Sequence, residues 1–190
     1  MTERAPVTEP EYPISSNARA LAPNDGVRLV NTVFGTVEVY SKDPGFVVAV
    51  VGRYLLQLSL KEGTMTTVSL VRRAATDLSA RYDKFGYIGL IDPGAQLLMA
   101  PDVRNGVNSF VKRFSPRFTA AAIVYEKTGF HATAVRSVVT AINFASRASH
   151  PNQVFSDLRE GVSWVAKVTP GEPTTAGLTH IIRLLLKNPT

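Results

Sequence analysis

The sequence predicts an α/β fold, a single small domain with a mixed, mostly parallel β-sheet of four to five strands and helices packed on it. Short apolar runs alternate along the chain with longer segments whose apolar residues recur every three or four positions. The turn residues Asp92-Pro93-Gly94 follow the apolar stretch Tyr87 to Ile91 and mark one strand, turn and helix unit. A chain of 190 residues with 45% hydrophobic content can build one good core but hardly two full domains.

The first part of the chain predicts an arm followed by a hairpin. Residues 1–28 hold four of the twelve prolines and little apolar periodicity, which is typical of a flexible N-terminal arm. Side chains from Val33 to Tyr40 alternate between two sets, as in a strand with one face more exposed to solvent. After the turn Asp43-Pro44-Gly45, the continuously apolar run Phe46 to Val51 indicates a strand buried on both faces.

The next elements predict a change from strand to helix. Tyr54 to Leu60 is ambiguous and is interpreted as extended. From Thr64 the period changes to that of a helix with one buried stripe, which holds Val68, Val71, Ala75, Leu78 and Tyr82. Phe85 to Ile91 is the next short apolar run.

Two further helix and strand units follow. A helix is expected from Pro101, because proline suits a first helical position, and Pro116 ends it. Phe118 to Tyr125 indicates another buried strand, and an amphipathic helix follows Gly129. Strands separated by helices of this length need crossover connections, so the later strands should be mutually parallel.

The C-terminal segment predicts an appended amphipathic helix. The domain, residues 29–168, is followed by a linker and helix at 169–190, in which Leu178, Ile181, Ile182 and Leu185 share one face. Such a short helix is marginal alone and must dock on something. It covers its own sheet, or it is offered to a second subunit or a partner groove.

Composition limits the class of protein. There is no cysteine, which excludes disulfides and thiolate metal sites and favours a reducing compartment. The N-terminus lacks the order of a secretory signal, and the longest purely apolar run, Phe46 to Val51, is far too short to span a bilayer, so we expect a cytoplasmic protein. The net charge of +6 favours anionic partners, such as an acidic protein.

One stretch and the order of elements resemble a known family. The stretch is Val154-Phe155-Ser156-Asp157-Leu158-Arg159-Glu160-Gly161-Val162-Ser163-Trp164-Val165. Both resemble STAS-like domains, the family of anti-sigma-factor antagonists and their Sec14-related bacterial relatives. The resemblance covers residues 34 to 166 by order of elements. It implies a small α/β domain that binds another protein and, in classical members, a phosphorylated serine at a place that corresponds here to Ile91 to Ala95. Asp92 matches the preceding aspartate, but Pro93 and Gly94 stand where the hydroxyl would be, which makes that switch doubtful.

Few side chains suggest chemistry. Asp92 could face a ligand at the end of a strand, but Asp-Pro-Gly is more often turn chemistry. His131, His150 and His180 show no metal-ligand spacing, so neither a metal nor a cofactor is predicted. The cations Arg104, Lys112, Arg113 and Arg117 could form a patch for phosphate or an acidic partner, although a solvated helix face explains most such clusters.

The sequence therefore favours a non-catalytic signalling or scaffolding module that acts by protein–protein interaction, with the surface near Asp92 to Arg104 as its contact. The alternative is a binder of an anionic or lipid-like small ligand, which an apolar pocket with a cationic mouth would support. An enzyme ranks third, because acid, base and nucleophile candidates do not converge. A homo-oligomer is compatible with this interpretation, and nucleic acid is disfavoured because no stacking aromatics accompany the cations.

Overall fold

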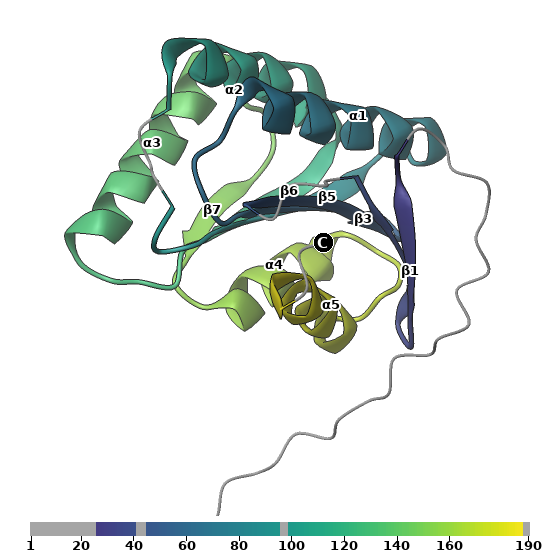
Figure 1. The fold of residues 1–190 in the computed structure, drawn as a ribbon. Coiled ribbons are helices and arrows are strands. Elements are labelled where there is room, and N and C mark those ends of the chain that lie inside the picture. Colours follow the sequence, from purple (N-terminus) through teal and green to yellow (C-terminus); the bar gives the residue numbers. More distant parts are fainter. Residues whose placement is uncertain (1–25, 41–44, 96–98, 188–190) are drawn as a thin grey trace, which may run out of the picture.

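A computed structural model describes residues 26–40, 45–95 and 99–187. Within these ranges one sheet of seven strands runs in the order β1-β2-β3-β4-β5-β6-β7, with helices on both of its faces (Figure 1). The predicted α/β class is confirmed. The predicted sheet of four to five mostly parallel strands is wrong, because β1 and β7 add a strand at each edge and the pairings β1–β2, β2–β3 and β3–β4 are antiparallel, which is as many as are parallel.

The N-terminal hairpin corrects two predicted boundaries. β1 (Arg28–Thr32) pairs antiparallel with β2 (Gly35–Val39), so the predicted arm, residues 1–28, overlaps the start of the sheet, and its residues 1–25 lie outside the described residues. The strand predicted from Val33 to Tyr40 begins two residues later than predicted, at Gly35. Thr32 Oγ1 accepts the N–H of Phe34 at 3.1 Å and forms a turn, and Gly35 has φ +116°, a value that favours glycine.

The centre of the sheet changes from antiparallel to parallel at β4. β3 (Phe46–Val51) pairs antiparallel with β2 and with β4 (Tyr54–Ser59), which confirms the ambiguous segment as a strand. β5 (Phe85–Ile91), β6 (Phe118–Val124) and β7 (Asn152–Phe155) then add one after another, each parallel to its neighbour. The parallel arrangement of the later strands is as the sequence predicts, whereas β7 is not among the predicted strands.

Three helices connect the parallel strands and cover one face of the sheet (Figure 1). They are α1 (Met65–Arg81), α2 (Pro101–Phe114) and α3 (Phe130–Ser146). Strands added in sequential order with crossovers of one hand place every connection on the same side. The apolar core under α1 and α2 includes Val48, Val50, Leu55, Val71, Leu78, Phe85, Phe110 and Phe118.

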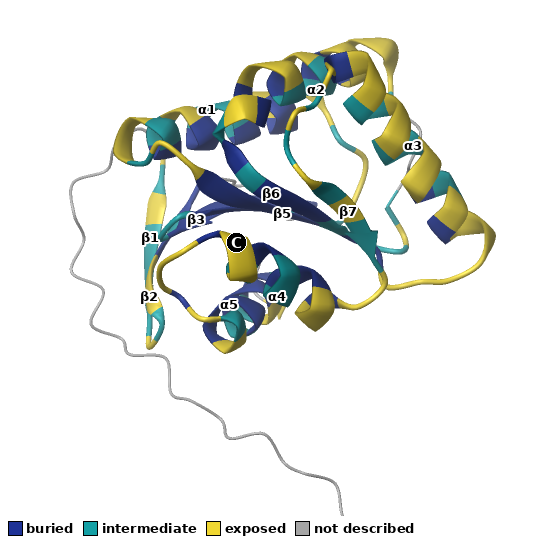
Figure 2. Ribbon diagram, turned by 180° about the vertical axis from the view of Figure 1, so that it is seen from behind, coloured by how far each residue is buried: buried dark blue, intermediate teal, exposed yellow. Residues whose placement is uncertain are grey.

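Two helices cover the opposite face (Figure 2). They are α4 (Leu158–Val168) and α5 (Thr175–Lys187), and the core beneath them includes Val47, Ala49, Leu56, Leu58, Ile88, Val124, Val162 and Ile181. Glycines let α4 approach closely, because a Cβ on Gly86 would lie 2.6 Å from Val165 Cγ1 and one on Gly161 would lie 2.9 Å from Val124 Cγ2.

Helix ends follow from the local sequence. Thr64 and Thr67 form a reciprocal capping box at the start of α1, and Asp157 Oδ1 accepts the N–H of Glu160 at the start of α4. α2 begins at Pro101, as predicted, and passes into the short 3-10 helix Ser115–Arg117 at Pro116. In the described residues, none of these helices has the length and apolar character needed to cross a membrane.

Candidate functional site: a cavity between the sheet and three helices

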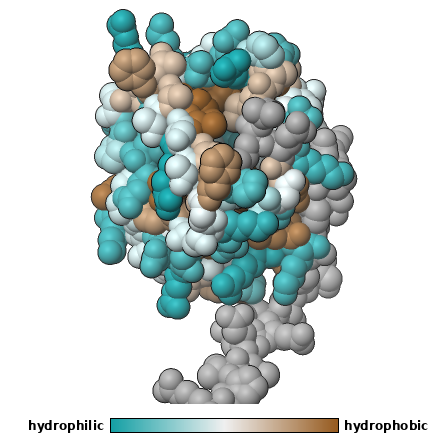
Figure 3. Space-filling view, turned by 90° about the vertical axis from the view of Figure 1, so that its left-hand side faces the viewer, coloured by the Kyte–Doolittle hydropathy of each residue, from teal (hydrophilic) through white to brown (hydrophobic). Residues whose placement is uncertain are grey.

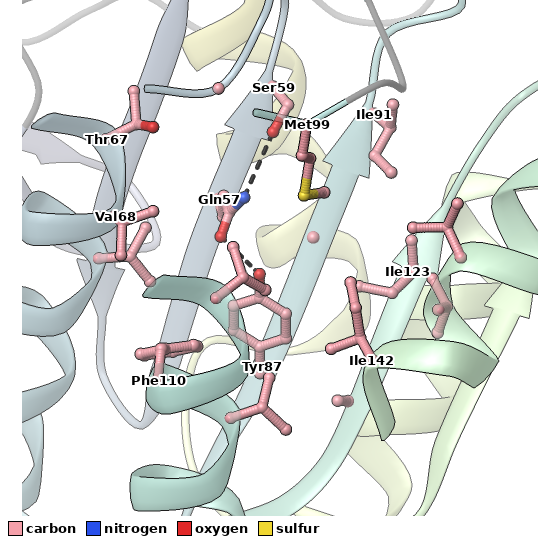
Figure 4. Close-up of a pocket in the computed structure, with 18 of the residues that line it drawn as sticks. Gln57, Ser59, Thr67, Val68, Tyr87, Ile91, Met99, Phe110, Ile123 and Ile142 are labelled. Atoms are coloured by element: carbon pink, nitrogen blue, oxygen red, sulfur yellow. Dashed lines mark hydrogen bonds between the residues drawn. The ribbon is translucent and has the colours of Figure 1, made fainter. Parts of the chain in front are cut away.

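A cavity of about 160 Å³ lies between the sheet and the layer formed by α1, α2 and α3 (Figure 4). Its walls are mainly aliphatic and aromatic, and include Val68, Val71, Val103, Val107, Phe110, Ile123, Val135, Val139 and Ile142. It extends towards the carboxyl ends of β4 and β5, where Ser59 and Ile91 line it. Open α/β sheets place ligands at this edge.

The cavity exists because two residues of the sheet beneath it have little or no side chain. Gly89 in β5 and Ala121 in β6 face α2 and α3. A Cβ built on Gly89 would lie 2.9 Å from Ile123 Cδ1 and 3.3 Å from Tyr87 Oη. The small side chain of Ala121 and the missing one of Gly89 leave room beneath α2 and α3, and the side chains of Ile123 and Tyr87 occupy the part of it directly over Gly89.

Polar groups of β4 enter this apolar space from one side. Tyr87 Oη donates to Gln57 Oε1 at 2.6 Å, and Gln57 Nε2 donates to Ser59 Oγ at 3.3 Å. Figure 4 shows these groups in one line along the sheet. Burial raises the pKa of Tyr87, so its phenol stays protonated and remains the donor to Gln57.

One cation lies where this polar line reaches the surface. Lys61 lines the cavity and is exposed. Within the described part of the chain, Lys61 has no ion pair, and no aspartate or glutamate is among the described residues that line the cavity.

The opposite end of the cavity is polar but uncharged. His150 packs edge-on against the Phe118 ring, and its Nδ1 lies 2.8 Å from Ser115 Oγ. Burial lowers the pKa of His150 to about 4, so the ring is neutral at pH 7. Asn152 Nδ2 donates to Asn143 Oδ1 at 3.3 Å, while Asn152 Oδ1 has no partner among the described residues.

The predicted residues Asp92, Pro93 and Gly94 form a turn beside the cavity. Asp92 Oδ1 accepts the N–H of Gly94 at 2.7 Å, and the Asp92 carbonyl accepts the N–H of Ala95 at 2.9 Å. Ala95, immediately after the turn, lines the cavity, as does Met99, and residues 96–98 lie outside the described residues. The aspartate thus performs the turn chemistry that the sequence suggested as the more common role.

The predicted cationic residues lie elsewhere. Arg104, Lys112 and Arg113 are exposed on α2 and do not line the cavity. The Arg113 guanidinium lies 5.2 Å from the centre of the Phe114 ring. Arg117 Nη1 pairs with Asp83 at 2.6 Å. These cations therefore belong to the outer surface rather than to the site.

The predicted partner-helix residues are all in the core. Leu178, Ile181 and Ile182 are 0% exposed and Leu185 is 4% exposed, all against the face of the sheet opposite the cavity. α5 therefore docks on its own chain. A second chain could reach these four side chains only if α5 left the sheet.

The other two histidines, and the serines at each end of the cationic stretch of α2, are scattered. His131 is exposed next to Phe130, and His180 packs against Phe34. Ser109 is exposed on α2, whereas Ser115 is buried beside His150. In the described ranges no three His, Asp or Glu residues lie close enough together to hold a metal ion.

Sequence reasoning missed the residues that make the site. Gln57 and Ser59 alternate with leucines along β4, and Gly89 interrupts a buried strand two residues after Tyr87. A polar side chain and a glycine inside otherwise apolar strands were signals of a close approach or a space. Only the register, which sets Gln57 opposite Gly89 and Tyr87 opposite Ala121, brings them together.

Comparison of the chain with models of known protein families, with curated proteins and with solved structures returned no match. The assignment of function therefore rests on the site.

Proposed function

We propose that this protein is a non-catalytic binding module that holds a small, largely apolar ligand in the cavity between the sheet and α1, α2 and α3. The observation that carries the proposal is the apolar cavity of about 160 Å³, with the Gln57 and Tyr87 pair on one side and Lys61 at its opening. Ligand sites in proteins are typically concave and apolar, with a few placed polar groups.

The chemistry of the lining supports binding rather than turnover. Among the described residues of the lining, the titratable groups other than Lys61 are Tyr87 and His150, and burial holds both in the neutral form. The Tyr87 proton is donated to Gln57, and His150 Nδ1 is engaged with Ser115. The Tyr87 proton and His150 Nδ1 are therefore both engaged within the protein. The order of elements from β3 to α4 supports a STAS-like, Sec14-related domain as the setting.

The test is a titration of the full chain with toluene, followed by NMR of the methyl groups. We expect saturable shifts at Val103, Val107 and Ile142, which line the cavity, because an apolar cavity of about 150 Å³ accepts a benzene-sized molecule. Val107→Phe fills the cavity and should abolish the shifts. Val168→Phe is the matched control, since Val168 is 52% exposed on α4 at the other face of the sheet.

Two results would contradict the proposal. Shifts that are absent in the wild-type chain would mean that the cavity is closed in solution. Equal shifts in Val107→Phe and wild-type protein would place the probe elsewhere.

A second candidate function is protein interaction through the outer face of α3, in a signalling or scaffolding role. Phe130 and Phe144 are 83% and 88% exposed on this helix, and the positions between them on the same side, Ser137 and Ala141, are small and exposed. Figure 3 shows this side of the molecule, where apolar side chains lie among hydrophilic ones. Ser137 stands midway, so two antiparallel copies of α3 would place Phe130 of each against Phe144 of the other.

The proposed occupant of this face is thus a second copy of the chain. Light scattering after size exclusion should give a dimer mass for the wild-type chain and a monomer mass for Phe144→Glu. The control, Val33→Glu, changes another exposed apolar residue, far along the chain in the β1–β2 turn. A monomeric wild-type chain over the micromolar range would exclude this candidate.

A further inference from the structure

The two ends of the cavity differ in the kind of hydrogen bond that they offer. At the β4 end the available groups are donors: one N–H of the Gln57 amide is not used by Ser59, and the Ser59 hydroxyl accepts from Gln57 and keeps its own proton to give. Lys61 adds an ammonium group just beyond Ser59. At the far end, Asn152 Oδ1 offers an acceptor.

Among the described residues, the charge that lines the β4 end is positive only. Lys61 is the one charged side chain among the described residues of the lining, because His150 is neutral and no carboxylate is present. The nearest carboxylates along the chain are Glu62, which is exposed and does not line the cavity, and Asp92, whose Oδ1 is bonded to the backbone of Gly94. An anion at this end would therefore meet donors and a cation rather than a like charge.

The shape of the floor adds a second constraint. Gly89 lies opposite Gln57 on one side and Ile123 on the other, and the side chains of Ile123 and Tyr87 bound the cavity beside it. Phe110 and Ile142 face this floor from α2 and α3 (Figure 4). A space of about 160 Å³ bounded in this way suits one planar ring. Ser59 lies two residues beyond Gln57, towards the carboxyl edge of the sheet and opposite Ile91.

We propose that the ligand is a ring-bearing carboxylic acid, whose ring lies between the sheet and the side chains of Phe110 and Ile142 and whose carboxylate is held by Gln57, Ser59 and Lys61. This inference rests on the proposed function and narrows it from apolar ligands in general to one class. Tyr87 acts as a positioning residue for Gln57. Its donation to Gln57 Oε1 turns the Gln57 amide so that the NH₂ group points towards Ser59 and the carboxylate.

The experiment compares benzoate with benzamide at pH 7.5 by the methyl NMR titration described for toluene. We expect benzoate to bind about tenfold more tightly, the ratio that corresponds to about 1.4 kcal/mol from one charge-assisted contact. Lys61→Met keeps the apolar stem and removes the charge. It should lower the affinity for benzoate to that for benzamide and leave benzamide unchanged.

The control is Lys112→Met, which removes an equal charge from the exposed face of α2, outside the cavity. Equal binding of benzamide and benzoate, or an equal loss of benzoate affinity in Lys112→Met and Lys61→Met, would overturn the carboxylate inference. Either result leaves toluene binding, and with it the proposed function, intact. Failure of all three probes would overturn both proposals together.

Discussion

His150 illustrates how a single residue acquires its properties from its neighbours. Its imidazole is enclosed by the Phe118 ring, by Ser115 and by the end of the cavity, and burial lowers its pKa to about 4. In the unfolded chain the pKa would be near 6.5. The unfolded state therefore binds a proton that the folded state excludes.

This difference predicts a loss of stability on acidification. The contribution of His150 is fully present above pH 6.5 and declines as the pH falls towards 4, because protonation then favours the unfolded chain. After discounting for solvent screening we expect a decline on the order of 1 kcal/mol. Urea unfolding at several pH values should show this decline in the free energy of unfolding of the wild-type protein. In His150→Gln the free energy of unfolding should depend less steeply on pH. Parallel curves for the two proteins would exclude the effect.

At the scale of elements, α5 shows that an amphipathic face alone does not say what covers it. Leu178, Ile181, Ile182 and Leu185 gave the same pattern whether the helix docked on its own sheet or on a partner. The turn between β1 and β2 helps to decide, because the Phe34 ring packs against α5 at Gly177 and His180. The hairpin and the helix thus cover each other.

Truncation in α5 should therefore reduce stability rather than association. Leu185→Ala removes a side chain that is 4% exposed in the core, and large-to-small changes of this kind cost about 2–5 kcal/mol. Leu184→Ala, one position away and only half-buried, is the matched control and should cost clearly less. Chemical denaturation measures both. Equal midpoints for the two variants would contradict the docking of α5 on its own chain.

At the scale of the whole molecule, the two sides of the sheet are packed unequally. α4 buries Leu158, Gly161, Val162 and Val165 within 11 residues, and two glycines bring it close to the strands. α3 has 17 residues but buries only Ala132, Val135 and Ser146. The cavity lies on the less densely packed side, where the helix layer has fewer contacts to lose on opening.

This asymmetry predicts the order of local opening. Amide hydrogens of α3 should exchange with solvent faster than those of α4, because opening α3 exposes less apolar surface. Hydrogen exchange followed by mass spectrometry measures both helices in one experiment, and benzoate should slow exchange in α3 selectively. Faster exchange in α4 than in α3 would contradict the packing argument.

The sequence by itself determined the α/β class, the helices that begin near Thr64 and Pro101, and the parallel pairing of the later strands. These follow from periodicity and from helix-start residues, which act over a few neighbouring positions. β1 was missed, because Arg28 to Thr32 shows no alternation of apolar and polar residues and gains its place only by pairing with β2.

The tertiary structure alone decided where α5 docks and where the site lies. Gln57, Gly89 and Ala121 stand far apart in the chain and carry no motif, and the register of three strands makes them neighbours. A cavity is a volume that side chains leave unfilled, so it depends on how layers stack rather than on any local pattern. For that reason Asp92 and the cations of α2, which are conspicuous in the sequence, lie beside the cavity or outside it.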